Sequence, residues 1–264
     1  MKQLVQRALG RFGFELHRKR PGFVPFVPHL VPISLAGVDF QFWIGDPIGE
    51  EWYKPEGHKH LAEHTETARL VRPGDRVLDI DAHHGFITML LSKLVGENGF
   101  VLAVEPSSFN AMIANAQIGL NRVANCQVVE AAISDRKGNI KFSQRNLEDE
   151  RIAIGDGIEV PSITADELDA VFGPFDMLKI DVQGFEYQVL RGAENLIHRR
   201  PRMVLELHGQ RIAHYGHTGK DVLALLDSRY TGTFVSWDAR DKVYPFPDGR
   251  FNPEEFASLF LSRS

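Results

Sequence analysis

Residues 77–86 read VLDIDAHHGF. A short apolar run carries two acids, Asp79 and Asp81, and is followed by two histidines, Gly85 and the helical pattern FITMLLSKLV. A strand, a polar turn with a glycine and a helix together form the β-α unit that holds nucleotide-like ligands in open α/β sheets. The stretch therefore predicts a ligand-binding loop around residue 81. The ligand must be one that can bind beside the carboxylate of Asp81.

The segments on both sides continue an alternation of strands and helices. Helical patterns are expected at residues 58–71, 85–95, 107–120, 185–197 and 221–226, and as a last amphipathic helix at the C-terminus. Strand patterns lie between them at GFVLAVE (99–105), CQVVEAAI (126–133), NIKF (139–142), DMLKID (176–181), MVLEL (203–207) and 233–237. The alternation predicts an α/β fold with a doubly wound, Rossmann-like parallel sheet and helices on both faces.

The chain divides into three parts by composition. Residues 1–20 form a basic amphipathic pattern that fits either a docking helix or peripheral contact with an anionic membrane surface. Residues 21–57 are rich in proline, which excludes a central strand or a long helix and predicts an extended or edge-strand lead-in. Residues 58–264 form the main domain.

Bulk composition narrows the class of protein. A net charge of −5 and a pI near 6.1 provide no electrostatic footprint for nucleic acid, so no nucleic-acid partner is expected. There is one cysteine, Cys126, and we see neither an apolar run long enough to span a bilayer nor a signal peptide. We expect a cytoplasmic protein.

Most of the predicted strands end in acids. Asp79, Glu105, Asp181 and Glu206 each close a strand, and the carboxyl ends of parallel strands are where ligands bind in such sheets. Four acids at one edge favour a ligand with positive charge and hydroxyls. A nicotinamide dinucleotide is disfavoured, because Asp81 facing a pyrophosphate would cost roughly 3 kcal/mol at about 5 Å. S-adenosylmethionine fits better: Glu105 would accept the ribose hydroxyls, and Asp79 or Asp81 the ammonium.

Five ordered pieces of the chain resemble the FkbM family of S-adenosylmethionine-dependent methyltransferases. They are VLDIDAHHGFITMLLS (77–92), AVEPSSFNAMIANAQIGLN (103–121), VVEAAISDRKGNIKF (128–142), KIDVQGFEYQVLRGA (179–193) and PRMVLELH (201–208). The resemblance implies the class I methyltransferase fold and O-methylation of a hydroxyl on a sugar, a glycan or a small natural product. On this basis the residues assigned to the cofactor are Asp79, Asp81, His83, Gly85, Thr88, Glu105, Pro106 and Asp135.

The sequence also departs from the family pattern. Asp81 stands where the pattern has a glycine, His83 where it has an asparagine, and Gln183 where it has a glutamate. Aspartate tolerates a positive φ, so the turn can survive, but a side chain fills space beside the methionyl end of the cofactor. Two other functions therefore stay open: a catalytically silent scaffold or partner-binding protein, and, third, a dinucleotide-dependent oxidoreductase.

Asp181 and His208 are the candidate catalytic residues, because either could take the proton of an acceptor hydroxyl. The competing interpretation is that Asp181 only caps the helix at 185–197. Among His58, His60 and His64, the last two lie one helical turn apart, which is a metal-compatible spacing, but the spacing marks no third ligand. Histidines on an exposed helix are ordinary surface residues, so no metal is expected. The oligomeric state and the acceptor are left open.

Overall fold

The computed structural model describes residues 26–54, 62–143 and 151–263. The basic segment 1–20 lies outside the described residues, as do His58 and His60. Within the part of the chain that is described, no helix has the length and apolar character needed to cross a bilayer.

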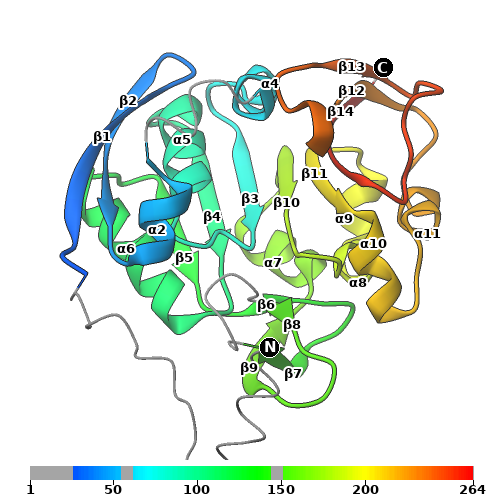
Figure 1. The fold of residues 1–264 in the computed structure, drawn as a ribbon, viewed down its shortest axis with the longest axis horizontal. Helices are drawn as coiled ribbons and strands as arrows, with labels where there is room; N and C mark the ends of the chain where they lie inside the picture. Colours follow the sequence, from blue (N-terminus) through cyan, green and yellow to red (C-terminus); the bar gives the residue numbers. More distant parts are fainter. Residues whose placement is uncertain (1–25, 55–61, 144–150, 264) are drawn as a thin grey trace, which may run out of the picture.

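An eight-stranded sheet forms the centre of the molecule (Figure 1), in the order β13-β12-β14-β11-β10-β3-β4-β5. Its parallel half consists of β3 (Arg76–Ile80), β4 (Phe100–Val104), β5 (Cys126–Val129), β10 (Met177–Ile180) and β11 (Arg202–His208). β3, β4 and β10 are almost fully buried, so apart from Arg76, Asp79 and Lys179 their residues are apolar instead of alternating with polar ones.

Helices cover both faces of this sheet, as predicted. One layer shares a core with Leu78, Leu178 and Leu205. It is built from α7 (Ala165–Phe172), α8 (Glu186–Arg191), α9 (Glu194–His198), α10 (Gly209–Ile212) and α11 (Gly219–Ala224). The opposite face carries Val77, Val101 and Met177, packed against α4 (Ala62–Leu70) and α5 (Phe86–Val95). The doubly wound α/β fold is therefore confirmed.

The C-terminal part differs from the prediction. Residues predicted as a last amphipathic helix form β14 (Phe256–Arg263), which lies antiparallel between β11 and β12 (Tyr230–Ser236). Five consecutive residues, Ala257–Leu261, are buried, so both faces of this strand are buried and periodicity alone cannot distinguish it from a helix. β13 (Tyr244–Phe246) completes the edge, and short 3-10 helices lie at Ala213–Tyr215 and Trp237–Ala239.

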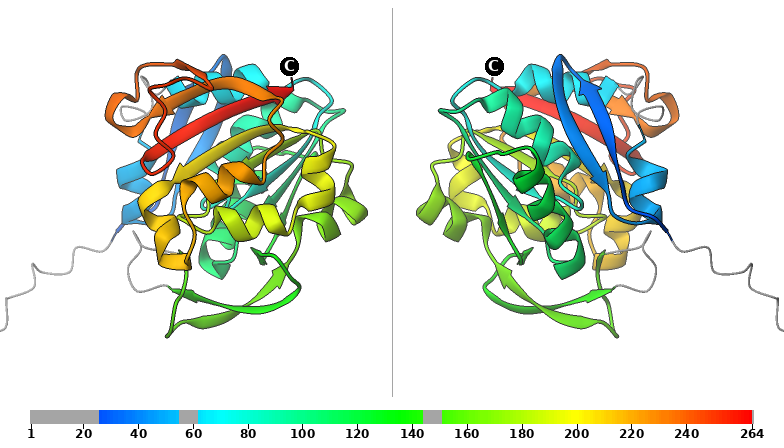
Figure 2. Two further views of the ribbon diagram at one scale, coloured as in Figure 1. Left: turned by 90° about the vertical axis from the view of Figure 1, so that its right-hand side faces the viewer. Right: turned by 90° about the vertical axis from the view of Figure 1, so that its left-hand side faces the viewer.

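Two predicted elements are divided in the structure. The segment 126–133 splits into β5 and β6 (Ala132–Ile133), and β6 belongs to a separate four-stranded sheet with β7 (Gly138–Ser143), β8 (Arg151–Ile152) and β9 (Ile158–Ile163). This small sheet stands at one end of the molecule (Figures 1 and 2). The helix predicted at 185–197 breaks at Gly192, where a Cβ would come within 2.0 Å of the Ser134 carbonyl oxygen.

The proline-rich lead-in forms a β-hairpin outside the main sheet. Strands β1 (His29–Leu35) and β2 (Val38–Ile44) pair only with each other and pack on α5 and α6 (Ser108–Leu120), and α2 (Pro47–Trp52) follows. Pro32 is accommodated within this short pair, as expected for proline outside a central strand. The hairpin and α2 thus bring Trp52 and Tyr53 toward the loop that follows β3.

Candidate active site

The register of three parallel strands collects polar side chains on one face at the carboxyl edge of the sheet. Lys179 of β10 lies beside Asp79 of β3 on one side and Val204 of β11 on the other. Because side chains two residues apart on a strand share a face, Asp181 and Glu206 continue the same row.

A pocket of ≈ 920 Å³ opens over this row. Its walls come from α2, α4, the β3–α5 loop, β10, β11 and the C-terminal strands, and acidic side chains outnumber basic ones among its lining residues. The acids are Glu51, Glu63, Asp81, Asp181, Glu206, Asp238 and Glu255, and the bases are Lys179, Arg211 and Arg240. The pocket therefore favours ligands that carry positive charge or donate hydroxyl hydrogen bonds.

The loop after β3 has three residues with positive φ: Asp81 at 63°, His83 at 49° and Gly85 at 79°. The turn survives with aspartate at its first position, as expected. The amides of Asp81 and Ala82 donate to the Val104 carbonyl at 2.9 and 3.1 Å, which ties the loop to the end of β4. Gly85 packs against Ala114 of α6, where an added Cβ would lie 3.2 Å from the backbone.

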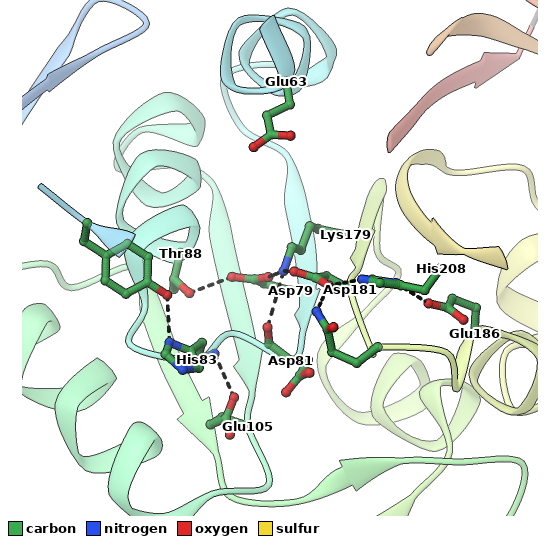
Figure 3. Close-up of polar contacts among 12 residues, drawn as sticks. Glu63, Asp79, Asp81, His83, Thr88, Glu105, Lys179, Asp181, Glu186 and His208 are labelled. Carbon is green, nitrogen blue, oxygen red and sulfur yellow. Dashed lines mark hydrogen bonds and ion pairs between the residues drawn. The ribbon is translucent and has the colours of Figure 1, made fainter. Parts of the chain in front are cut away.

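Asp79 lies beneath the loop rather than on the pocket wall. Its carboxylate is fully buried, accepts the Thr88 hydroxyl at 2.6 Å and lies 3.7 Å from Lys179 Nζ (Figure 3). Burial raises the pKa of Asp79, while Lys179 and Thr88 oppose that shift. Thr88 and Asp79 thus support the loop from below, and of the two acids predicted for the ammonium only Asp81 lines the pocket.

Glu105 holds the loop through its backbone. Its Oε2 accepts the His83 N–H at 2.7 Å, its Oε1 accepts the Ser107 N–H at 2.8 Å, and the side chain is 1 % exposed. Asp81 faces this acid. Burial, together with the carboxylates of Glu105 and Asp181, raises the pKa of Asp81 well above its usual value. The expected ribose acceptor therefore also has a structural role that the sequence did not reveal.

The two histidines connect the loop to the lead-in segment. His83 Nδ1 lies 2.7 Å from the Tyr53 hydroxyl, and its ring stacks on Trp52 and on His84. His84 is 1 % exposed and lies 3.9 Å from Asp46. Burial lowers the pKa of both imidazoles, which favours their neutral forms. The sequence left open whether they contact a ligand or fill the loop; His83 lines the pocket and His84 packs behind it.

Asp181 and His208 lie next to each other on the pocket wall, away from His83 (Figure 3). His208 Nε2 lies 3.6 Å from Asp181 Oδ1, and its Nδ1 lies 2.7 Å from Oε1 of Glu186. Glu186 is fully buried and also accepts the Gly184 N–H at 3.0 Å. It therefore does more than complement the helix dipole: it fixes the ring of His208.

The structure excludes the interpretation of Asp181 as a helix cap. The N-cap of α8 is Phe185, and no side chain caps that helix. Instead Asp181 accepts from Gln183 at 3.1 Å and lies 3.5 Å from Lys179 Nζ. Gln183, a departure from the family pattern, has a φ of 54° and binds Arg211. The pair Asp181 and His208 is thus directed into the pocket.

The remaining predicted residues have different positions. Pro106 lines a small apolar hollow of ≈ 20 Å³ beside the main pocket, and Asp81 borders both cavities. Asp135 lies on neither wall; its side chain is 42 % exposed and accepts the Ser134 hydroxyl at 3.1 Å. His64, interpreted as an exposed histidine, is buried at 5 % exposure next to Phe86, because α4 covers the sheet face with that side.

Sequence reasoning missed Lys179, which reaches three carboxyl-edge residues. Its ammonium lies near Asp79 and Asp181 and donates to the Asp81 carbonyl at 3.3 Å. Burial lowers the pKa of this lysine, but the surrounding carboxylates outweigh that and raise it. A lysine in an otherwise apolar strand, KID, was the signal that could have identified it. Tyr53 had no comparable signal, because only the folded chain brings it to the loop.

Fold and site together define an α/β protein with a ligand pocket at the carboxyl edge of its sheet. The family model described as Methyltransferase FkbM domain matches residues 79–232, more than half of the chain. The chain belongs to the FkbM methyltransferase family.

Similar solved structures include the following three. Methyltransferase FkbM from Methylobacillus flagellatus is 13 % identical, with a TM-score of 0.46, and the match covers 73 % of this chain and 48 % of that one. A protein described as a putative rRNA methylase from Clostridium thermocellum is 14 % identical, with a TM-score of 0.47. The match covers 78 % of this chain and 98 % of that one. Fibrillarin from Aeropyrum pernix, with natively bound S-adenosyl-L-methionine, is 14 % identical, with a TM-score of 0.46. The match covers 73 % of this chain and 68 % of that one.

The match to the Methylobacillus protein spans about half of that protein's length. No match was found among curated protein sequences. The family assignment therefore rests on the family model alone.

Proposed function

We propose that the chain is an O-methyltransferase that methylates a hydroxyl of a sugar, a glycan or a small natural product. The observation that carries the proposal is the arrangement of Asp181 and His208, held by the buried Glu186, on the wall of a polar pocket beside the β3–α5 loop. An acceptor hydroxyl must lose a proton during methyl transfer, and a carboxylate or imidazole within reach can take it.

The carboxylates around the β3–α5 loop suit S-adenosylmethionine. Asp81, on the pocket wall, would lie beside the amino-acid end of the cofactor. Glu105 is 1 % exposed and does not line the pocket, so the loop that it holds would have to open before its carboxylate could accept the ribose hydroxyls. The apolar hollow beside Asp81, lined by Val104, Pro106 and Phe185 among others, has the chemistry to receive the adenine, but at ≈ 20 Å³ it must widen to do so. When bound, the cofactor supplies an electrophilic methyl group on a sulfonium.

The chain's own residues then orient the acceptor and move its proton. Glu186 fixes the ring of His208, so that Nε2 faces Asp181 and the pocket. Trp52 and Trp237 line the same pocket with exposed rings, which provide flat apolar surfaces for a sugar or a natural-product scaffold. Alignment supplies much of the acceleration in such a displacement, so these orienting contacts matter as much as the base.

The test is transfer of an isotope-labelled methyl group from S-adenosylmethionine to a panel of sugars, glycosides and hydroxylated aromatics. We expect a labelled methyl ether in at least one acceptor class, and its loss in Asp181→Asn. Label found on nitrogen or carbon instead would contradict O-methylation while leaving methyl transfer intact.

A second candidate function is a silent scaffold or partner-binding protein. The observation that favours it is Glu105, whose two carboxylate oxygens already accept backbone amides, with Asp81 facing the same acid. In that case neither S-adenosylmethionine nor S-adenosylhomocysteine binds. The dinucleotide oxidoreductase ranks third, because the acid-rich pocket repels a pyrophosphate. We propose no nucleic-acid partner.

A further inference from the structure

We propose that Asp181, Glu206 and His208 bind a divalent cation at the floor of the pocket. Each of these side chains offers one ligand atom, and these atoms all lie within 4.8 Å of one another. The register explains the cluster: Ile180 of β10 pairs with Leu205 of β11, so Asp181 and Glu206 follow side by side. His208 shares the strand face of Glu206, two residues further along.

The orientation of His208 is the second observation, and it comes from outside the cluster. Glu186, fully buried, holds Nδ1 at 2.7 Å, and the imidazole is itself only 4 % exposed. The other ring nitrogen, Nε2, is left facing Asp181 Oδ1 at 3.6 Å. Histidines that bind metals almost always direct their second nitrogen to a carboxylate or carbonyl in this way, because it fixes the tautomer and the ring.

Lys179 and Arg240, whose charges act on Glu206, pair directly with other carboxylates. Lys179 Nζ lies 3.7 Å from Asp79 and 3.5 Å from Asp181 Oδ2, and Arg240 binds Glu63 at 2.7 Å. The backbone of Glu206 pairs with Ser258 of β14, but among the residues that the structure describes none makes a hydrogen bond or ion pair with its carboxylate. A divalent cation would balance its charge together with the Oδ1 side of Asp181.

The donor set indicates which metals suit the site. Two carboxylates and one imidazole, without a thiolate, fit Mn²⁺ or Fe²⁺ better than soft metals, and three protein ligands leave coordination positions open. Resting on the proposed function, we infer that an acceptor oxygen takes one open position. Coordination lowers the pKa of a bound hydroxyl, so the acceptor would release its proton to water in the open pocket instead of to Asp181 or His208. Its oxygen would then take the methyl group as S-adenosylhomocysteine leaves.

Titration with Mn²⁺, followed by electron paramagnetic resonance of the free ion, tests the site on the full chain. We expect one bound ion per wild-type chain and at least tenfold weaker binding in Glu206→Gln and His208→Asn. Glu186→Gln, which keeps all three ligands, should weaken binding by about 10- to 100-fold through the orientation of His208. The matched control is Glu255→Gln, which removes an equal charge from the same pocket and should bind like wild type.

Thermal unfolding with and without Mn²⁺ checks each variant, so that loss of the fold is not mistaken for loss of the site. No bound ion in the wild type at millimolar Mn²⁺, or equal weakening in Glu255→Gln, would overturn the inference. Calorimetry with S-adenosylhomocysteine on the same samples separates the two proposals. Cofactor binding without Mn²⁺ binding rejects only the cation site, and Mn²⁺ binding without cofactor binding rejects only the methyltransferase proposal.

Discussion

Glu105 accepts the backbone N–H of His83 at 2.7 Å, so the acid that ends β4 holds the loop that follows the neighbouring strand β3. Both groups are part of the candidate cofactor site. The contact means that the shape of the loop depends on an acid whose expected task was to bind ribose. Loop geometry and cofactor affinity should therefore change together when Glu105 is altered.

Glu105→Gln should lower the free energy of unfolding by about 1 to 3 kcal/mol, because an amide can accept only on its oxygen and leaves one buried N–H unsatisfied. Affinity for S-adenosylhomocysteine should fall as well, and in Glu105→Ala by about 2 to 4 kcal/mol if the acid also accepts ribose hydroxyls. Urea denaturation and calorimetry measure the two effects. The exposed Glu97→Gln is the control, and unchanged stability in Glu105→Gln would refute the loop-holding role.

Lys179→Met should destabilise the fold by about 3 to 5 kcal/mol, because it leaves the buried carboxylate of Asp79 without its cation. The exposed Lys141→Met should have little effect. In a double-mutant cycle, adding Asp79→Asn to Lys179→Met should recover part of the loss. Additive losses in that cycle would show that the two residues do not interact.

Asp81→Gly should tighten S-adenosylmethionine binding by about 1 kcal/mol after screening, because it removes excess negative charge beside the carboxylate of the cofactor. Glycine also adopts the φ of 63° without strain. Calorimetry at fixed ionic strength measures the difference. Looser binding would mean that Asp81 pairs with the ammonium and that the loop is a working variant.

Stability should depend on pH through Asp81. Its pKa in the folded chain lies above 3.8, the usual value, because the folded state favours the protonated carboxyl group. The stability that this preference contributes is fully present below pH 3.8 and is lost as pH rises through the pKa of the folded state. Asp81→Asn cannot ionise. The free energy of unfolding of wild type, relative to Asp81→Asn, should therefore decrease as pH is raised from about 4 toward neutrality. Denaturant titrations across this range check the slope, and parallel curves would contradict it.

The sequence predicted the parallel half of the sheet because its strands are short apolar runs between strong helical patterns. It failed at β14, where burial on both faces hides the alternation that marks a strand. The acids at the strand ends were found for the same reason as the fold: position after a strand determines position at the sheet edge. Partners across the chain, such as Tyr53 for His83 and Glu186 for His208, depend on tertiary packing and have no local signature.

The central claim is that the loop at residues 81–85 still holds the methyl donor. Calorimetric titration of the full chain with S-adenosylhomocysteine, S-adenosylmethionine and a nicotinamide dinucleotide tests it most directly. We predict that one molecule of S-adenosylhomocysteine or S-adenosylmethionine binds per chain and that the dinucleotide does not bind. Binding of the dinucleotide alone, or no binding of either sulfur ligand at millimolar concentration, would contradict the account.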